Sequence, residues 1–155
     1  MLSDLYSERI LEAAAAIPPA RRLEKPDASA TKISRVCGSE VSVDLNLKDG
    51  AVADFGMEAK ACALGQASSS ILARNIIGAR ADELYALRDA MRAMLKENGE
   101  PPHIALGAPR WKELEALSAI RDYPQRHAST MLVFEAVCAC LDALRASGGE
   151  AIAEA

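Results

Sequence analysis

Aromatic residues are scarce in this sequence. One Trp, three Tyr and two Phe make up 4% of its 155 residues, whereas 50% of the chain is hydrophobic and alanine is abundant. This composition favours closely packed helices over an aromatic-rich β fold. A chain of this length can bury roughly two-thirds of its unfolded surface without disulfides. We therefore expect one domain over residues 1–147 and a flexible C-terminal tail over 148–155.

The sequence also lacks a surplus of positive charge and a long apolar run. Its formal net charge is −4, whereas a nucleic-acid-binding domain normally carries a basic surplus. The segment MLSDLYSERI has acidic residues where a signal peptide would have Lys or Arg. We find no stretch that approaches the roughly 18 apolar residues of a membrane helix. These absences predict a cytoplasmic protein with no nucleic-acid partner and no membrane association.

Hydrophobic periodicity predicts several helices along the chain. Apolar residues recur at helical spacing over 3–16, 65–77, 82–97 and 132–146, and a shorter helix follows Trp111. Ser3 is a candidate N-cap for the first helix. Residues 20–32 have no period and are interpreted as an irregular, mobile arm, and residues 97–109 as a loop.

A β-hairpin is the strongest local signal. Apolar residues alternate with polar ones on both sides of an Asp49-Gly50 pair, at Val41, Val43, Leu45 and Leu47 and again at Ala51, Ala53, Phe55 and Met57. In a regular hairpin with this turn, Cys37 would lie opposite Cys62 with Cα atoms on the order of 5 Å apart. A bulge would shift the pairing by one residue, but both thiols would still lie at the same end of the sheet.

The four cysteines have different surroundings, and in the reducing cytosol they are expected to be thiols. Cys138 and Cys140 are two positions apart on a predicted helix and point about 200° from one another. Cys140 lies on the apolar stripe, so these two receive no functional assignment. Cys37 and Cys62 have three interpretations: buried small residues, a redox pair, or half of a metal or sulfur site.

Cys62 favours the third interpretation. It comes just before a predicted helix N-terminus and two residues after Lys60, and both features stabilise a thiolate. A thiolate binds iron or zinc and attacks persulfide sulfur. The small residues Ala61, Ala63 and Gly65 leave room for a bulky ligand, or they serve only close packing of a helix on the sheet.

Four segments resemble the U-type iron–sulfur cluster scaffold proteins, the group of IscU, NifU N-terminal domains and SufU. They are LYSERILE, VCGSEVSVDLNLKDGAVADFGMEAKAC, CALGQASSSILARNIIG and ELEALSAIRDYPQRHASTML, and they occur in order over roughly residues 5–145. The long segment before RDYPQRHAS is most similar to the SufU subtype. The resemblance implies an α+β fold in which a small antiparallel sheet with a central hairpin is packed by about four to five helices.

The resemblance also implies a function. Family members are non-catalytic scaffolds that use three cysteines and an aspartate to hold zinc or a nascent cluster, and they accept sulfur from a cysteine desulfurase. By position, Cys37 and Cys62 match the first two cysteines, whereas Ser39 takes the aspartate position and Ser129 the third cysteine position. A serine hydroxyl is a poor ligand for these metals. Two of the four usual ligands are therefore replaced.

Two residues are candidate replacement ligands. His127 lies two positions before Ser129 and would otherwise be a surface or loop-anchoring residue. Glu40 follows Ser39 and would otherwise be an exposed residue at a strand start. Ser129 itself is a natural N-cap for the last helix.

Three hypotheses follow. The first is a scaffold that binds iron, zinc or a transient iron–sulfur cluster through Cys37 and Cys62, aided by His127, with a cysteine desulfurase and other cluster-assembly proteins as partners. The second is a sulfur relay that never holds a complete cluster and uses Cys62 as persulfide acceptor. The third is a thiol enzyme with Cys62 as nucleophile and His127 as base.

Overall fold

The computed structural model describes residues 6–35 and 37–146. Its elements are α2 (Glu8–Ala15), β1 (Ala28–Ile33), β2 (Glu40–Lys48), β3 (Ala51–Lys60), α3 (Ala63–Asn75), α4 (Ala81–Lys96), α5 (Pro102–Ala105), the 3-10 helices η1 (Pro109–Asp122) and η2 (Pro124–Arg126), and α6 (His127–Ala146). The strands form one antiparallel sheet in the order β1-β2-β3. The predicted α+β fold, a small antiparallel sheet packed by helices, is confirmed.

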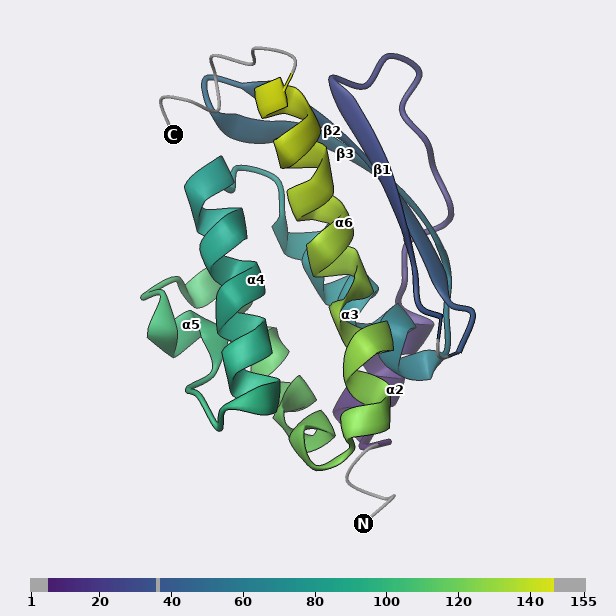
Figure 1. The fold of residues 1–155 in the computed structure, drawn as a ribbon, viewed down its shortest axis with the longest axis vertical. Helices are drawn as coiled ribbons and strands as arrows, with labels where there is room; N and C mark the ends of the chain where they lie inside the picture. The colour runs from purple at the N-terminus through teal and green to yellow at the C-terminus, as the bar shows by residue number, and fades with distance from the viewer. Residues whose placement is uncertain (1–5, 36, 147–155) are drawn as a thin grey trace.

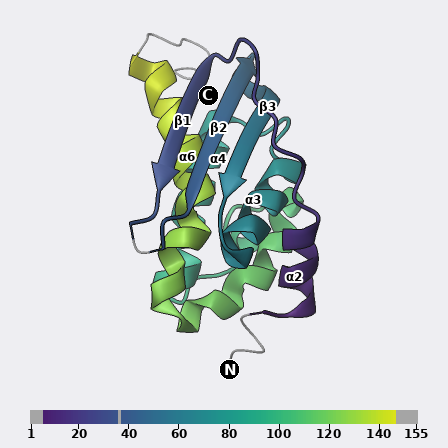
Figure 2. The same ribbon diagram turned by 90° about the vertical axis from the view of Figure 1, so that its right-hand side faces the viewer.

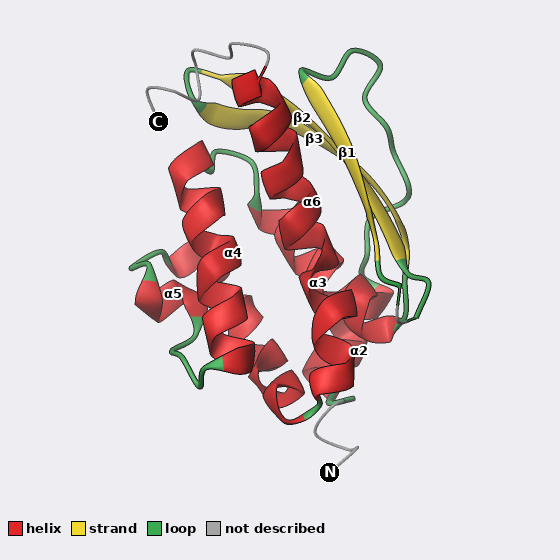
Figure 3. Cartoon of the chain, viewed as in Figure 1, coloured by secondary structure: helices red, strands yellow, loops and turns green. Residues whose placement is uncertain are grey.

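The sheet covers one side of a layer of helices (Figure 1, Figure 3). Helix α6 runs between the sheet and α4, and α2 lies beside α3 at one end of the sheet. Figure 2 shows the outer face, with β2 in the middle. The inward side chains of β2 are fully buried and contribute Val41, Val43 and Leu45 to the core.

Helix α6 is the most apolar element. The segment Pro124–Ala146 is long and apolar enough to cross a membrane by length and composition, contrary to the sequence-based expectation, but 67% of its most apolar window is buried within the protein. Cys140 lies in this helix and is fully buried, as predicted, with its thiol 3.4 Å from the carbonyl oxygen of Val43. The apolarity of α6 is therefore that of a core helix.

The hairpin forms as predicted, but it contains a bulge. Asp49 and Gly50 have positive φ angles of 55° and 81°, as a two-residue hairpin turn requires, and Lys48 pairs with Ala51. The register then shifts beyond Leu47, so that Ala53 is an additional residue in β3. From there to the open end each partner is displaced by one residue, and the expected pairing of Cys37 with Cys62 is wrong.

The core requires this bulge. In a regular hairpin with this turn, an odd-numbered residue of β2 always faces an even-numbered residue of β3. The buried residues Phe55 and Met57 would then lie on the opposite face from Val43 and Leu45. The bulge pairs Leu45 with Phe55 and Val43 with Met57, which brings all four to the helical side.

Residues 20–32, predicted as an irregular arm, are instead tied to the sheet. The main chain of Arg21 exchanges two hydrogen bonds with that of Met57, at 3.0 and 2.7 Å. The chain then continues into β1, which pairs with β2. The alternation of β1 is hard to detect in the sequence because the positions on its inward face are Ala28, Ala30 and Lys32, none of them a large apolar residue.

Asp44 fastens this segment to the outer face of the sheet. Its side chain is 1% exposed and accepts two 2.8 Å hydrogen bonds from Arg22, as well as bonds from the Leu23 amide and the Ser29 hydroxyl. These donors lower the pKa of the Asp44 carboxyl to about 2, the Arg22 bond most of all. Gly56, opposite Asp44 in β3, provides the space for this carboxylate, because a Cβ at Gly56 would lie 3.2 Å from it.

Several element ends differ from the sequence-based expectations. The N-cap of α2 is Ser7, whose side chain accepts a bond from the Ile10 amide, while Ser3 lies outside the described residues. Helix α5 falls within the predicted loop 97–109 and starts at paired prolines, which suit a first helical turn. The predicted tail 148–155 also lies outside the described residues.

Candidate thiol site

Strand β2 begins and strand β3 ends at the same end of the sheet (Figure 2). Cys37 precedes the start of β2 by three residues, and Cys62 follows the end of β3 by two. Cys37 belongs to the loop between β1 and β2, and Cys62 is the N-cap residue of α3. Glu40 and Lys60 form the last pair of the hairpin. Cys37 comes shortly before Glu40 in the sequence, and Cys62 shortly after Lys60. The hairpin therefore brings the two cysteines to one end of the sheet without pairing them.

Cys37 is held by a tight loop. The amide of Ser34 donates to the carbonyl of Ser39, and the amide of Gly38 donates to that of Ser34, both at 2.8 Å. Gly38 has a φ of 76°, which favours glycine, and a Cβ at this position would meet nothing within 4 Å. Cys37 is exposed on this open loop, with its Sγ 3.0 Å from the buried hydroxyl of Ser39.

Cys62 is placed by the contact between α3 and α6. Its thiol donates to the hydroxyl of Ser129 at 3.7 Å. A Cβ at Gly65 would lie 2.8 Å from the Ala61 side chain and 3.2 Å from the Ser129 carbonyl oxygen, so only glycine allows this approach. Gly65 thus serves close packing of α3 on α6.

The environment of Cys37 favours its thiolate. The hydroxyl of Ser39 lowers the pKa of the Cys37 thiol, and the Ser34 hydroxyl, the Ser39 amide and the positive charge of Arg126 act in the same direction. Burial raises the pKa slightly, but it is outweighed. An exposed thiol with these neighbours is suited to nucleophilic attack and to metal binding.

The donor set does not complete a metal site. Within residues 6–35 and 37–146, no three His, Cys, Asp or Glu side chains lie close enough together to hold a metal ion. The partners of the two thiols are hydroxyl groups, which bind thiophilic metals weakly. What the chain itself offers is two thiols, each beside a serine.

The comparisons with known proteins identify the family. The family model of the NifU-like N terminal domain matches residues 5–130. The chain belongs to this family. It is 49% identical to a nitrogen-fixing NifU-like protein (N-terminal) from Brucella abortus of known crystal structure, covering 99% of this chain and 97% of that one with a TM-score of 0.83.

Other relatives of this NifU-like chain are more distant. It is 29% identical to an iron–sulfur cluster assembly scaffold protein IscU of Thermotoga maritima, over 79% of this chain and 82% of the relative. A structure named as a SufU-type scaffold from Fervidobacterium islandicum has a TM-score of 0.75 over 90% of this chain and 98% of that one. At 22% identity that likeness shows the fold alone, so the SufU subtype stays a prediction.

His127, predicted as a further ligand, lies in another environment. Its side chain is buried, and its Nε2 lies 3.0 Å from the carbonyl oxygen of Ile120 and 3.2 Å from that of Arg121. The ring thereby fastens the end of η1 to the start of α6, which matches the loop-anchoring interpretation. No hydrogen bond joins it to Cys62 in the described part of the chain, so the geometry gives no support to a Cys62–His127 catalytic pair.

Ser129 and Glu40 also differ from expectation. Helix α6 begins at His127, so Ser129 lies inside its first turn and is not its N-cap. Its hydroxyl donates to the carbonyl of Arg126 at 3.2 Å and accepts from Cys62. Glu40 is half-buried at the start of β2 and belongs to no group of metal-binding side chains among the described residues.

Arg126 is a site residue that the sequence did not reveal. It lies in η2, next to α6, and its charge reaches Cys37. Its Nε is buried and has no hydrogen-bond partner in the described structure. Arg126 comes directly before His127, Ala128 and Ser129 in the segment that resembles the scaffold family. This position was a signal in the sequence, because a cation there would stabilise a thiolate or sulfide.

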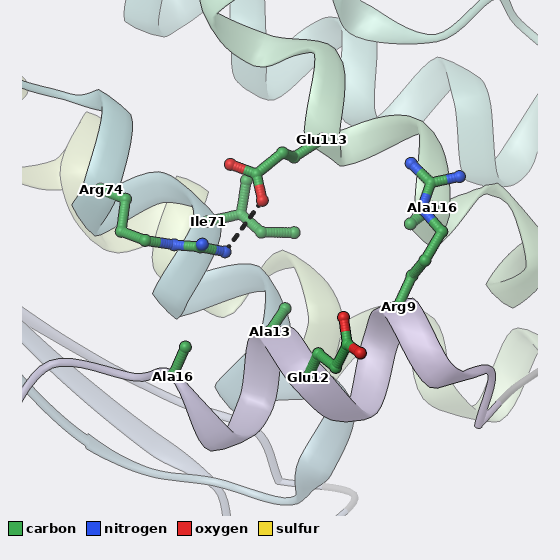
Figure 4. A pocket seen from close by; sticks show the side chains of 8 residues that line it. All are labelled: Arg9, Glu12, Ala13, Ala16, Ile71, Arg74, Glu113 and Ala116. Carbon is green, nitrogen blue, oxygen red and sulfur yellow. Dashed lines mark ion pairs between the residues drawn. The ribbon is translucent and has the colours of Figure 1, made fainter.

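Three hollows of the described surface lie away from the thiols, and one of about 500 Å³ is lined by residues that include Arg22, Glu24 and Lys25. One of about 390 Å³ between α2, α3 and η1 is lined by four charged side chains, Arg9, Glu12, Arg74 and Glu113, of which the last two form a 3.0 Å ion pair (Figure 4). Another of about 380 Å³ lies against β3 and includes Pro18 and Phe55. No cysteine lines any of these three hollows.

Proposed function

We propose that this protein works in iron–sulfur cluster assembly as a non-catalytic scaffold that handles iron and sulfur through Cys37 and Cys62. The observation that carries the proposal is the placement of these two thiols, each beside a serine, at one end of the sheet in a chain of the NifU-like family. A cysteine desulfurase would supply sulfur, and the protein would act in the cytoplasm. Zinc is an alternative metal for the same thiols.

Anaerobic reconstitution with ferrous iron and sulfide tests the scaffold role. Thiolate ligation of iron should give visible charge-transfer absorption, and the Cys37→Ala, Cys62→Ala double variant should stay colourless. Cys138→Ala is the matched control because its thiol is buried in α6, with its nearest polar partner the Leu84 carbonyl. Equal metal and sulfide content in the double variant and the wild type would refute the proposal.

A sulfur relay is the second candidate, favoured by the incomplete donor set. In this role a thiolate of the site attacks the outer sulfur of a desulfurase persulfide; the old S–S bond breaks, a new one forms, and the desulfurase cysteine leaves as a thiolate that takes up the proton. Cys62 is the predicted acceptor, but the exposed Cys37 is better placed to meet a partner first.

Mass spectrometry after incubation with a desulfurase and cysteine distinguishes the relay from the scaffold. A relay gains about 32 Da on Cys37 or Cys62 and yields no coloured protein on reconstitution. A scaffold yields the colour. Persulfide confined to Cys138 or Cys140 would contradict both roles.

A further inference from the structure

The two edges of the sheet differ in what covers them. The edge of β3 exchanges main-chain hydrogen bonds with Arg21, and Val52 in the same strand bonds to Gly78 and Ala79. Strand β1 forms the other edge, and in the described residues the side of β1 away from β2 pairs with nothing (Figure 2). The pairing of β1 with β2 is regular over Ala28–Ile33, and the strand contains no proline. A regular, uncovered edge is a template for another strand.

The main-chain groups of β1 that point to this free edge can be assigned. One pair beyond the strand, the Ser34 amide donates to the carbonyl of Ser39, which lies opposite it, at 2.8 Å. In an antiparallel ladder, residues bonded to the partner strand alternate with residues whose N–H and C=O point the other way. The N–H and C=O groups of Ser29, Thr31 and Ile33 therefore point to the free edge. All three residues are exposed.

A second copy of the same strand fits this edge. When two copies run antiparallel about a two-fold axis at Thr31, the two Thr31 residues lie opposite one another, and each Ile33 lies opposite Ser29 of the second copy. Every outward residue of each strand is then paired, which gives about six hydrogen bonds between the strands. Opposed threonines are a favourable cross-strand pair. The pairing also covers part of Ile33, which is 58% exposed in a single copy.

The neighbouring residues select this register. On the inner face, Lys32 lies opposite Ala30 of the second copy, which leaves room for the lysine stem. Moving the axis to Lys32 would place the two Lys32 side chains opposite one another, and directly opposed like charges destabilise a strand pair. Moving it to Ala30 would place Ile33 opposite Asp27, whose amide already donates to the carbonyl of Leu45 in β2. That register would leave Ile33 without its bonds.

The charges that flank β1 are complementary in the same arrangement. Asp27 precedes the strand, Arg35 follows it, and both are exposed. Antiparallel copies bring Arg35 of each copy toward Asp27 of the other. The printed bond of the Asp27 carboxylate, from the Leu47 amide, uses Oδ2 and leaves Oδ1 for this contact. A strand that is acidic at one end and basic at the other favours an antiparallel copy of itself over a parallel one.

We propose that two copies of this chain associate through their β1 strands, so that two three-stranded sheets join into one continuous sheet about a two-fold axis at Thr31. The inference uses neither Cys37 nor Cys62 and is independent of the proposed function. The two Ser34 residues would lie about 20 Å apart along the sheet, so both Cys37 loops stay open to other proteins. Pairing through one strand gives a small interface, and the dimer should therefore depend on protein concentration.

Sedimentation equilibrium with a chelator present tests the association. From about 10 μM to about 1 mM protein, the mean mass should rise from that of one chain toward that of two. Thr31→Pro should stay a monomer throughout, because proline removes an N–H at the free edge but no hydrogen bond to β2. Thr31→Val is the matched control: it loses the same 2.7 Å contact with the Ser42 hydroxyl, keeps the N–H and should associate like the wild type. A wild type that stays a monomer, or a Thr31→Pro protein that associates as well as the control, would overturn the inference.

Disulfide cross-linking tests the register, and it holds even if the proline variant fails to fold. In a Cys37→Ala, Cys62→Ala background, Thr31→Cys places two thiols opposite one another with Cα atoms about 5.5 Å apart, within reach of a disulfide. Mild oxidation of the folded protein should convert most of the chains to a covalent dimer. Ile33→Cys is the control, because its two copies would lie about 13 Å apart along the sheet. No cross-link at position 31, or equal cross-linking at both positions, would refute the pairing.

Discussion

The two pairs of cysteines in this chain show how the surroundings of a thiol change its exposure and its pKa. Cys37 and Cys62 lie at the end of the sheet beside serine hydroxyls, whereas Cys138 and Cys140 lie in the core helix α6, facing backbone carbonyls. Burial raises the pKa of Cys138 to about 11 and of Cys140 to about 12, while the neighbours of Cys37 lower its pKa. Sulfur chemistry is therefore concentrated at one end of the sheet.

The largest expected effect is on thiol labelling. At pH near 8 the two core thiols should be ionised at only about one part in 10³ to 10⁴, so Cys37 should react with an alkylating reagent at least ~10²-fold faster than either. Peptide mapping of the native protein at timed intervals measures the rates. Labelling of Cys138 or Cys140 at a rate comparable to that of Cys37 would break the comparison.

Acid stability sharpens the contrast between burial with and without partners. Asp44 is as buried as the core thiols, yet Arg22 and its other donors hold its pKa at about 2, below its ordinary 3.8. A lowered pKa stabilises the fold above pH 3.8, and this contribution is lost as the pH falls toward 2. We expect a loss of about 2 kcal/mol in the free energy of unfolding from this group.

Urea unfolding as a function of pH measures this term. Asp44→Asn should be less stable than the wild type near neutral pH and should show a flatter profile below about pH 5. Parallel profiles for the two proteins would mean that Arg22 and the Leu23 amide do not hold the carboxylate as described.

Gly65→Ala addresses the packing that places Cys62. Alanine normally stabilises a helix interior relative to glycine, but the new Cβ would approach Ala61 and the Ser129 carbonyl oxygen. We expect a loss of about 1–3 kcal/mol in the free energy of unfolding and faster alkylation of Cys62, because α3 must move away from α6. A variant that is more stable than the wild type would show that α3 and α6 can accommodate a methyl group at position 65.

Replacing a cysteine by serine should have the smallest effect of these changes. The loss in the free energy of unfolding should nevertheless differ between a core cysteine and a cysteine at the end of the sheet. Cys140→Ser places a more polar group in the core and should cost about 1–2 kcal/mol. Cys37→Ser, on the exposed loop, should change the free energy of unfolding by less than about 0.5 kcal/mol. Chemical denaturation of the two variants checks this, and equal losses would mean that the loop of Cys37 is structurally as demanding as the core.

Much of the fold could be predicted because its signals are local. The Asp49-Gly50 turn and the alternation around it predicted β2 and β3, and helical spacing predicted α3, α4 and α6 with shifts of a few residues at their ends. Strand β1 was missed because its alternation rests on alanines, and because Asp44, which fastens the preceding segment, lies 22 residues beyond Arg22. Such a tie cannot be detected by periodicity.

The bulge had a signal that alternation alone obscured. The apolar residues of both hairpin strands carry odd numbers, and a two-residue turn between Lys48 and Ala51 cannot bring odd positions of both strands to one face. Parity therefore required an extra residue, and attention to it would have corrected the expected pairing of Cys37 with Cys62.

The site could be predicted only in part, because its contacts join distant segments. The motif placed Cys37 and Cys62 at one end of the sheet, and the structure agrees. The bond of Cys62 to Ser129 depends on the packing of α3 on α6, and the attachment of His127 to the carbonyl of Ile120 depends on the path of η1. Neither the packing of α3 on α6 nor the path of η1 could be derived from the spacing of residues in the sequence.

The additional residue Ala53 governs a site that it never touches. It lies nine residues before Cys62, about 30 Å along an extended strand. With a regular register in place of this bulge, Cys62 would come opposite Cys37, but Phe55 and Met57, each worth about 1.5–3 kcal/mol when buried, would leave the core face. The demands of the core outweigh those of a pair of thiols. A relative that gains or loses one residue in this hairpin should therefore preserve its hydrophobic face first, by gaining or losing a bulge.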